Sequence, residues 1–428
     1  MLAKRETEAK GELETAELRL RAMGPLGDTV ADFEGQSINV FGGITGERVV
    51  ARIYRYRRRK KHVVSAMVDA VLEPSPDRVA PPCPYYGPCS GCQWQHISYQ
   101  RQLQLKRETV EAQFRDYVRL ASAAVSPTLA APSRFNYRNH ARFTVRYGGQ
   151  LGFSNRITRR FVRIDECMLM DEGINDALTG LQDRAAETTN LSVRYGSRTG
   201  DRLVQPTLRD PRIPVRSGQT HYVEELLGRP FRIASPSFFQ VNTAQAERLV
   251  MLVRDRLALS GDETIVDAYA GVGVFAIMLA PHVGMSIAVE ESHAATEDAR
   301  KNVGDLRNVV FVEAKTEHAL ASLVEDHGLE GPPDAVILDP PRVGCHREAL
   351  DALLGMRPAR VVYISCDPPS LARDLDILVS GGYSLDTVEP VDMFPQTYHV
   401  ECVATLSASP HAQQDAAPDA PRLNGGRA

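Results

Sequence analysis

The pattern of apolar and polar residues divides this chain into three regions. From residue 17 to residue 75, short alternating runs such as "SINVFGG" and "RVVARIYRY" predict several short strands joined at glycines and acidic residues. Many short strands in so small a region are typical of an oligonucleotide-binding (OB-like) β-barrel. The proline-rich stretch "EPSPDRVAPPCP" then leads out of this region.

The second region, residues 76–234, begins with a polar, helix-like stretch, "ISYQRQLQLKRETVEAQFRDYV". Alternating segments follow it, among them "YRNHARFTVRY", "GQLGFSN" and "RRFVRIDECML". Their period of two predicts an antiparallel sheet, so we expect an α+β central domain here.

In the third region, residues 235–406, apolar strands alternate with glycine turns and helical segments. This order predicts an α/β, Rossmann-like, doubly wound domain with a largely parallel sheet. We expect residues 1–16 to be a flexible, charged start and residues 407–428, rich in Ala, Pro and Gly, to be a disordered tail. The expected strands lie at 264–269, 285–290, 309–313, 334–339, 359–365 and 399–406.

Charge adds a candidate partner to this picture. The chain has 428 residues and a formal net charge of -4, which excludes a wholly basic, histone-like protein. Even so, six of the seven residues from Arg55 to Lys61 are basic, in a turn between two expected barrel strands. Because phosphates supply most sequence-independent affinity for nucleic acid, this turn predicts RNA contact.

The sequence gives no sign of membrane insertion. No apolar run approaches the roughly 18 residues needed to span a bilayer, and the first 17 residues are charged throughout. We therefore expect a cytoplasmic protein, a monomer without a membrane partner, whose seven cysteines stay reduced unless a metal or catalysis uses them.

Three expected strand ends in the third region carry candidate ligand-binding groups. Gly271 follows the first strand in "IVDAYAGVGVF", where small residues allow close backbone approach. Glu290 ends the second strand and suits ribose hydroxyls, and Asp339 ends the fourth in "LDPPR". The third glycine of a dinucleotide fingerprint is missing, so an adenosyl ligand without phosphates, S-adenosylmethionine, fits better.

Four cysteines form a second candidate site. Cys83, Cys89 and Cys92 lie within ten residues, in "CPYYGPCSGC", and Cys167 is the candidate fourth member. Four thiolates can bind zinc or an iron–sulfur cluster. Three clustered cysteines plus a distant one favour 4Fe-4S, while zinc and purely structural thiols remain alternatives.

Taken together, these motifs resemble the RNA 5-methyluridine methyltransferase family over roughly residues 15–406. The resemblance implies that the barrel is a TRAM domain and that the four thiols are the 4Fe-4S ligands of the cluster-bearing branch. The segments that carry it are "SPSFFQVNTAQAERL", "DAYAGVGVF", "DPPRVG", "VVYISCDPPSLARDL" and "FPQTYHVE".

The resemblance also assigns site residues. It implies that Cys366 is the nucleophile and Glu401 the general base. Two positions depart from the family pattern, because Asp367 replaces the usual Asn and Pro369 a smaller residue; an acid beside the thiol is expected to raise its pKa. The residues implied to line the S-adenosylmethionine site are Gln240, Tyr269, Glu290, Glu317 and Asp339.

The chemistry explains why a thiol is needed. C5 of uridine is a poor nucleophile, and thiolate addition at C6 turns the ring into an enolate whose C5 can accept a methyl group. A carboxylate must then remove the C5 proton. Both faces of the base must be reachable, so the uridine has to leave its stack. Cys345 and Cys402 match no motif and are interpreted as packing thiols.

Alternatives remain at this stage. "DPPR" alone also suits an adenine amino methyltransferase, although such enzymes need no thiol and usually have an aromatic residue where this chain has Arg342. A non-catalytic RNA-binding or RNA-folding protein with a degenerate methyltransferase domain is the alternative of another class. For the substrate, the barrel-plus-thiol layout favours 23S ribosomal RNA, with transfer RNA as the alternative.

Overall fold

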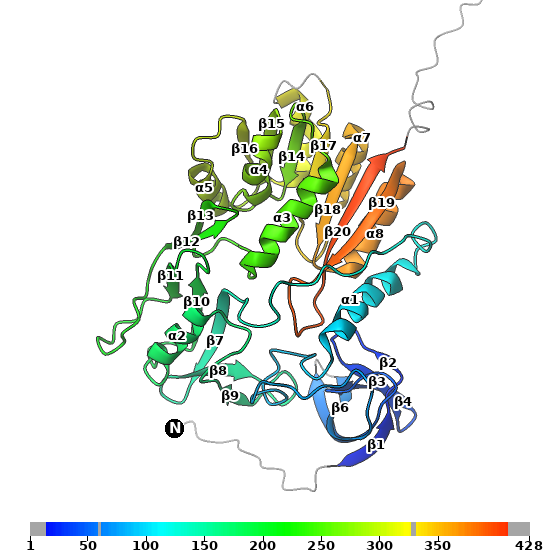
Figure 1. Cartoon of the computed structure of the whole chain (residues 1–428), viewed down its shortest axis with the longest axis vertical. Coiled ribbons are helices and arrows are strands. Elements are labelled where there is room, and N and C mark those ends of the chain that lie inside the picture. The colour runs from blue at the N-terminus through cyan, green and yellow to red at the C-terminus, as the bar shows by residue number, and fades with distance from the viewer. Residues whose placement is uncertain (1–13, 59–60, 327–330, 410–428) are drawn as a thin grey trace, which may run out of the picture.

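The computed structural model describes residues 14–58, 61–326 and 331–409, which build three sheet-based parts (Figure 1). Most of the expected flexible start and disordered tail lies outside the described residues. The last strand, however, runs to Ala408, two residues past the expected end of the third region. Within the described residues, no helix combines the length and apolar character needed to cross a membrane.

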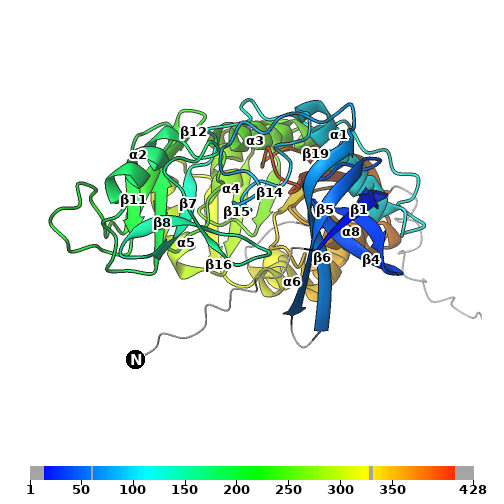
Figure 2. The same ribbon diagram turned by 90° about the horizontal axis from the view of Figure 1, so that it is seen from below.

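The N-terminal part is a six-stranded sheet in the order β1-β5-β6-β4-β3-β2. Alternate residues such as Leu18, Val40 and Val49 point inward and form its core, as the period-two pattern predicts. β5 and β6 continue beyond the sheet as a long hairpin (Figure 2), whose tip carries the basic run; positions 59–60 lie outside the described residues. The strands are β1 (Thr15–Arg19), β2 (Ala22–Met23), β3 (Thr29–Phe33), β4 (Gln36–Phe41), β5 (Arg48–Arg58) and β6 (Lys61–Glu73).

The central part contains the expected antiparallel sheet, in the order β11-β10-β7-β8-β9. α2 covers one face because Ile174, Leu178 and Leu181 repeat at helical spacing and pack into the core of the sheet. Its elements are β7 (His140–Arg146), β8 (Gln150–Ser154), β9 (Phe161–Arg163), α2 (Glu172–Leu181), β10 (Asn190–Tyr195) and β11 (Arg202–Gln205).

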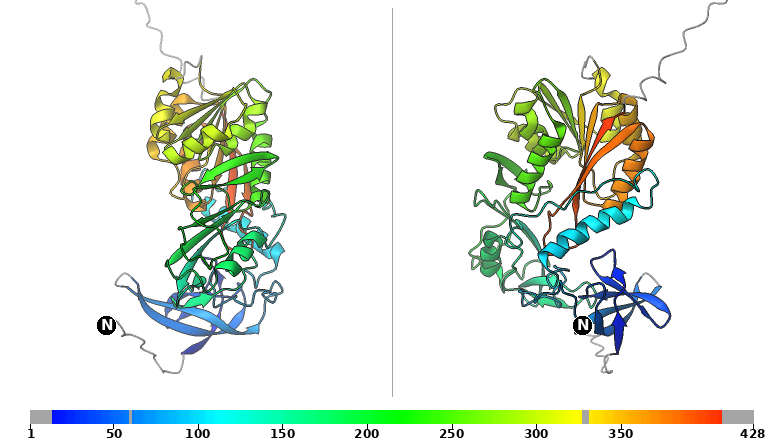
Figure 3. Two further views of the ribbon diagram at one scale, coloured as in Figure 1. Left: turned by 90° about the vertical axis from the view of Figure 1, so that its left-hand side faces the viewer. Right: turned by 45° about the vertical axis from the view of Figure 1, so that its right-hand side comes forward.

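Two elements of the expected central region pack against the C-terminal part instead. The hairpin of β12 (His221–Leu226) and β13 (Arg229–Ala234) contacts α5 (His293–Asn302), where Asp298 accepts hydrogen bonds from Ala234 N and Ser237 Oγ. Helix α1 (Tyr99–Phe114) runs from the N-terminal part to the C-terminal sheet and packs on α8 (Pro368–Ser380) and β19 (Tyr383–Val391) (Figure 3). The three parts are therefore interleaved along the chain.

The C-terminal part has a seven-stranded sheet in the order β16-β15-β14-β17-β18-β20-β19. β14 to β18 are parallel, as predicted, whereas β19 and β20 form an antiparallel hairpin at one edge. β19 was not predicted, because Asp386, Glu389 and Pro390 interrupt its apolar pattern; an edge strand tolerates such residues.

The strands of this part are β14 (Thr264–Ala268), β15 (Met285–Glu290), β16 (Val309–Glu313), β17 (Ala335–Leu338), β18 (Arg360–Ser365), β19 (Tyr383–Val391) and β20 (Glu401–Ala408). Its helices are α3 (Thr243–Leu257), α4 (Val274–Leu279), the 3-10 turn Ala280–His282, α5 (His293–Asn302), α6 (Thr316–Asp326), α7 (Arg347–Met356) and α8 (Pro368–Ser380).

A buried ion pair fastens the N-terminal sheet to the segment that follows it. The Glu47 side chain is fully buried and accepts hydrogen bonds from Arg78 Nε (2.6 Å), Ser75 N (3.1 Å) and Ile44 N (2.8 Å). Burial alone would raise the pKa of Glu47, but these donors outweigh it and the pKa is lowered. The pair therefore stabilises the fold above the ordinary pKa of 4.5 and stops doing so as the pH falls through the lowered value.

We expect Glu47→Ala to destabilise this junction by about 3 kcal/mol, because Arg78 and two backbone N–H groups lose their acceptor. Asp32→Ala is the matched control: it removes an exposed pair with Arg21 and should change stability by less than about 1 kcal/mol. Urea unfolding followed by the fluorescence of Trp94, the chain's single tryptophan, measures both. Trp94 packs against Ile44 at this junction, and equal losses in the two variants would contradict the prediction.

Candidate active site

One cavity of about 1130 Å³ lies where the carboxyl ends of β14, β15, β17 and β18 meet. Ligands bind at this edge in open parallel sheets, since the turns leaving neighbouring strands diverge there. The eight residues predicted for catalysis and cofactor binding all line it: Gln240, Tyr269, Gly271, Glu290, Glu317, Asp339, Cys366 and Glu401.

The glycine turn and the second strand form one side of the cavity. Gly271 has a φ of +56°, a conformation that residues with a Cβ rarely adopt, and a Cβ there would meet no atom within 4 Å. Its N–H donates to Glu290 Oε2 (2.8 Å), while Ser292 N donates to Glu290 Oε1 (2.7 Å). The Glu290 carboxylate is thereby held beside the turn, with lone pairs left to accept hydrogen bonds from hydroxyl groups.

Cys366 lies between the end of β18 and the start of α8, on the wall of the same cavity. Burial and the nearby Glu401 raise the pKa of its thiol to about 11, while Arg342 acts in the opposite direction. The site therefore stores a protonated thiol close to a guanidinium that can stabilise its anion.

Asp367, the departure from the family pattern, has a structural function here. It is the N-cap of α8, and its Oδ2 accepts a hydrogen bond from Ser370 N (3.1 Å). The acids that raise the pKa of Cys366 are Glu401 and Asp339. We expected an acid adjacent in sequence to raise the pKa of the Cys366 thiol. The carboxylates that do so, Glu401 and Asp339, come from the ends of other strands, and Asp367 caps the helix.

Glu401 is the first residue of β20, which pairs with β18 so that Cys402 lies opposite Ser365. Its carboxyl is buried, and burial raises its pKa well above the ordinary value; Asp339 adds to the rise and Arg342 opposes it. Burial also raises the pKa of Asp339 to about 7. A carboxylate with a raised pKa is a competent proton acceptor near neutral pH.

Three further residues line the cavity without having been assigned a function from the sequence. Arg342 contacts His399 (Nη2 to Nδ1, 3.3 Å), and His399 stacks on Tyr398 with ring centroids 4.2 Å apart. Phe238 lies at the cavity with 69% of its surface exposed, which is unusual for an aromatic side chain. Arg342 belongs to the "DPPR" motif and His399 to the "HVE" motif, but only the fold shows that these two side chains contact each other.

Cys345 and Cys402, interpreted as packing thiols, are both buried. Cys402 belongs to the core cluster beneath the sheet. Cys345 borders the cavity beside Tyr269 and Tyr363, and burial raises the pKa of its thiol to about 12.

The four clustered cysteines line a second cavity, of about 430 Å³. Hydrogen-bond donors approach two of the sulfurs: Gly91 N is 3.5 Å from Cys89 Sγ, and Gln95 Nε2 is 3.1 Å from Cys92 Sγ. Burial raises the pKa of the Cys89 thiol to about 11. Across the described ranges, no three His, Cys, Asp or Glu side chains converge closely enough to hold a single metal ion.

The two cavities share a wall. Phe394 and His399 line both of them, and both residues belong to the connection between β19 and β20. The thiol cavity and the cavity that contains Cys366 and Glu401 are therefore adjacent.

Comparison with known proteins places this geometry in a family. Residues 219–409 match the family model described as tRNA (uracil-5-)-methyltransferase. An uncharacterized RNA methyltransferase of Thermosynechococcus vestitus is 34% identical over 92% of this chain and 98% of its own length. Another, from Listeria innocua, is 32% identical over 91% of this chain and 96% of its own length.

A solved structure shares the overall fold. The crystal structure of Pyrococcus abyssi tRNA (uracil-54, C5)-methyltransferase in complex with S-adenosyl-L-homocysteine superposes with a TM-score of 0.70. It is 24% identical and covers 91% of this chain and 100% of that chain, so the fold is shared over most of this chain. Because relatives that align over nearly their full length are more than 30% identical to this chain, and because the family model matches, the chain belongs to the RNA (uracil-5-)-methyltransferase family.

Proposed function

We propose that this protein methylates C5 of a specific uridine in RNA, using S-adenosylmethionine as methyl donor. The observation that carries the proposal is the meeting of Cys366 and Glu401 with the predicted cofactor residues in one cavity. The glycine turn and the Glu290 carboxylate suit an adenosyl group, because they offer close backbone approach and acceptors for ribose hydroxyls. S-adenosylmethionine, when bound, supplies an electrophilic methyl group.

We propose one residue for each step. The Cys366 thiolate adds to C6 of the uridine, which makes C5 nucleophilic enough to attack the methyl group of the sulfonium; the S–CH3 bond breaks and the neutral thioether leaves. Glu401 then takes the C5 proton; the C5–H electron pair restores the C5=C6 double bond, and the C6–S bond breaks to return the thiolate. Burial raises the pKa of both Cys366 and Glu401, and the Arg342 charge opposes both rises, so it favours their anionic forms.

RNA binding is assigned to the N-terminal, TRAM-like barrel and the basic tip of its long hairpin. Within that run, the side chains of Arg55 and Arg57 are both exposed, and Arg55 is paired with Glu14 and Glu34. Phosphate contact is therefore expected from the hairpin tip more than from its base. The intact Cys366, Glu401 and glycine turn argue against the alternative of a non-catalytic RNA-binding protein.

We further propose that Cys83, Cys89, Cys92 and Cys167 hold a 4Fe-4S cluster. A single cavity lined by four thiols, with N–H donors aimed at two sulfurs, suits a group larger than one ion. A bound cluster would supply covalent links between residues 83–92 and residue 167.

The substrate preference proposed here is 23S ribosomal RNA, on the layout of barrel and thiols, with transfer RNA as the alternative. The names of the family model and of the Pyrococcus abyssi protein point to transfer RNA. Both substrates contain single-stranded loops from which a uridine can be splayed into the cavity.

The substrate assignment predicts that a deletion strain loses 5-methyluridine at one position of 23S ribosomal RNA and keeps it in transfer RNA. Mass spectrometry of nucleosides from the two purified RNA pools, followed by position mapping, measures this. Loss confined to transfer RNA would replace the proposed substrate with the alternative.

The mechanism predicts opposite defects in two variants. Cys366→Ala should form neither product nor adduct yet still bind S-adenosylmethionine, because the thiol acts on the base. Glu401→Gln should methylate normal RNA but accumulate a Cys366–RNA adduct, since it cannot remove the C5 proton. RNA with 5-fluorouridine at the target should trap the same adduct on the wild-type enzyme. Intact mass and peptide mapping read out all three; attachment at Cys345 or Cys402 would contradict the mechanism.

The cluster assignment predicts that protein purified without oxygen is brown, with broad absorbance near 400 nm and about four irons per chain. Cys89→Ala should lose the colour and destabilise the central part, whereas Cys345→Ala, outside the thiol cavity, should keep the colour. Metal analysis that finds one zinc and no iron would overturn the assignment.

A further inference from the structure

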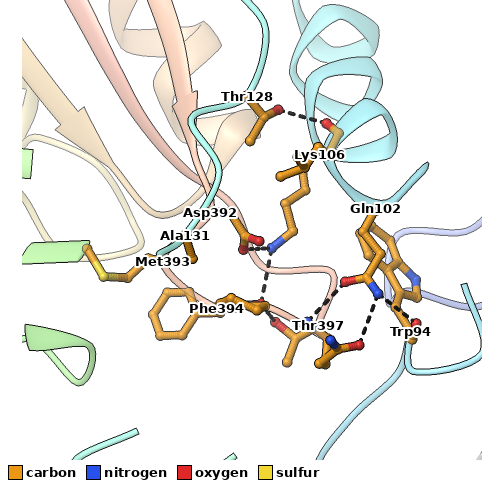
Figure 4. A network of polar contacts seen from close by, with 12 residues as sticks. Trp94, Gln102, Lys106, Thr128, Ala131, Asp392, Met393, Phe394 and Thr397 are labelled. Atoms are coloured by element: carbon orange, nitrogen blue, oxygen red, sulfur yellow. Dashed lines mark hydrogen bonds and ion pairs between the residues drawn. The ribbon is translucent and has the colours of Figure 1, made fainter. Parts of the chain in front are cut away.

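The connection between β19 and β20, residues 392–400, leads directly into Glu401; we call it the strap (Figure 4). It has no regular secondary structure, yet most of its residues are buried. A buried irregular segment needs partners for its polar groups from elsewhere in the fold. For the strap, many of these partners come from α1 and the residues just before it.

The first contact is a fully buried ion pair. Lys106 Nζ of α1 donates to Asp392 Oδ1 and also to the carbonyl oxygen of Phe394, at 3.1 Å (Figure 4). Tyr99, at the start of the same helix, donates its hydroxyl to Asp392 Oδ2 at 2.9 Å. Both charges of the pair have no exposed side-chain surface.

The second contact holds the turn of the strap. Gln102 Nε2 donates to Gln396 Oε1 (3.0 Å), and Gln396 N donates back to Gln102 Oε1 (3.0 Å). The carbonyl oxygen of Gln396 accepts from Gln93 N and Trp94 N. Gln396 has a φ of +69°, a conformation these contacts maintain.

Tyr99, Gln102 and Lys106 lie three and four residues apart, so they form one face of α1. A buried ion pair is weak evidence for stability, because apolar side chains of the same size often stabilise a fold as well. What such a pair does specify is one arrangement of the segments it joins. The segment fixed here carries His399 and Phe394 in the wall of the cavity and ends at Glu401.

We propose that Lys106, together with Gln102 and Asp392, positions the strap so that the Glu401 carboxylate reaches the C5 proton of the methylated uridine. This inference rests on the proposed function. Lys106 does not line the cavity, so it acts through the strap as a positioning residue for proton removal, after methyl transfer.

The test is Lys106→Met, with Arg107→Met as the matched control. Arg107 is the next residue on the helix and pairs with Glu111 at the surface. With normal RNA, Lys106→Met should release product about 10- to 100-fold more slowly and accumulate the methylated Cys366–RNA adduct, since small misplacements of a catalytic group have effects of this size. Formation of the adduct and the Kd of S-adenosylmethionine should stay within about twofold. Arg107→Met should match the wild type.

A lone buried Asp392 could prevent Lys106→Met from folding, so Lys106→Met/Asp392→Leu provides a second measurement without an unpaired charge. This double variant should also accumulate the adduct. If Lys106 contributes only to stability, the single variant should slow adduct formation and product release together, or the double variant should release product at the normal rate. Either result would overturn the inference.

If the wild-type protein traps no 5-fluorouridine adduct, the proposed function itself fails. If it traps the adduct and the variants release product normally, only this inference fails.

Discussion

The proposed methyl transfer in this protein depends on the fact that a parallel sheet gathers its strand ends at one edge. β14, β15, β17 and β18 come from separate stretches of sequence, yet their carboxyl ends bring Gly271, Glu290, Asp339 and Cys366 to one cavity. The antiparallel strand β20 adds Glu401 from the opposite direction. Because β20 starts where β18 ends, the proposed nucleophile and proton acceptor can lie on adjacent strands and still face the same base.

Local features made this edge predictable. A glycine turn, an acid at a strand tip and a cysteine before two prolines each follow from short stretches of sequence, and the structure brings the three together. Gln240 and Glu317 were found only through the family resemblance, because nothing local marks them as ligands. The family is confirmed, and the individual functions of these residues remain proposals.

What the sequence did not reveal depends on pairs of residues far apart. Lys106 lies in a polar helix and resembles a solvated surface residue, yet its partner, Asp392, is 286 positions away and both are buried. β19 was missed because edge strands lack a continuous apolar pattern, and the hairpin of β12 and β13 gave no sign that it packs on α5. Single-sequence periodicity carries information about burial along one element but none about which distant element covers it.

The interleaving of the chain has a consequence for biosynthesis. α1 contributes Val110 and Phe114 to the core beneath the C-terminal sheet, but β19, against which it packs, begins only at Tyr383. At roughly 5–20 residues per second, a ribosome needs on the order of 15 to 50 seconds to make the intervening chain. Throughout that interval the apolar face of α1 lacks its final partner, while the barrel before it is already complete. In the nascent chain, Val110 and Phe114 therefore stay without their final packing until the last strands emerge.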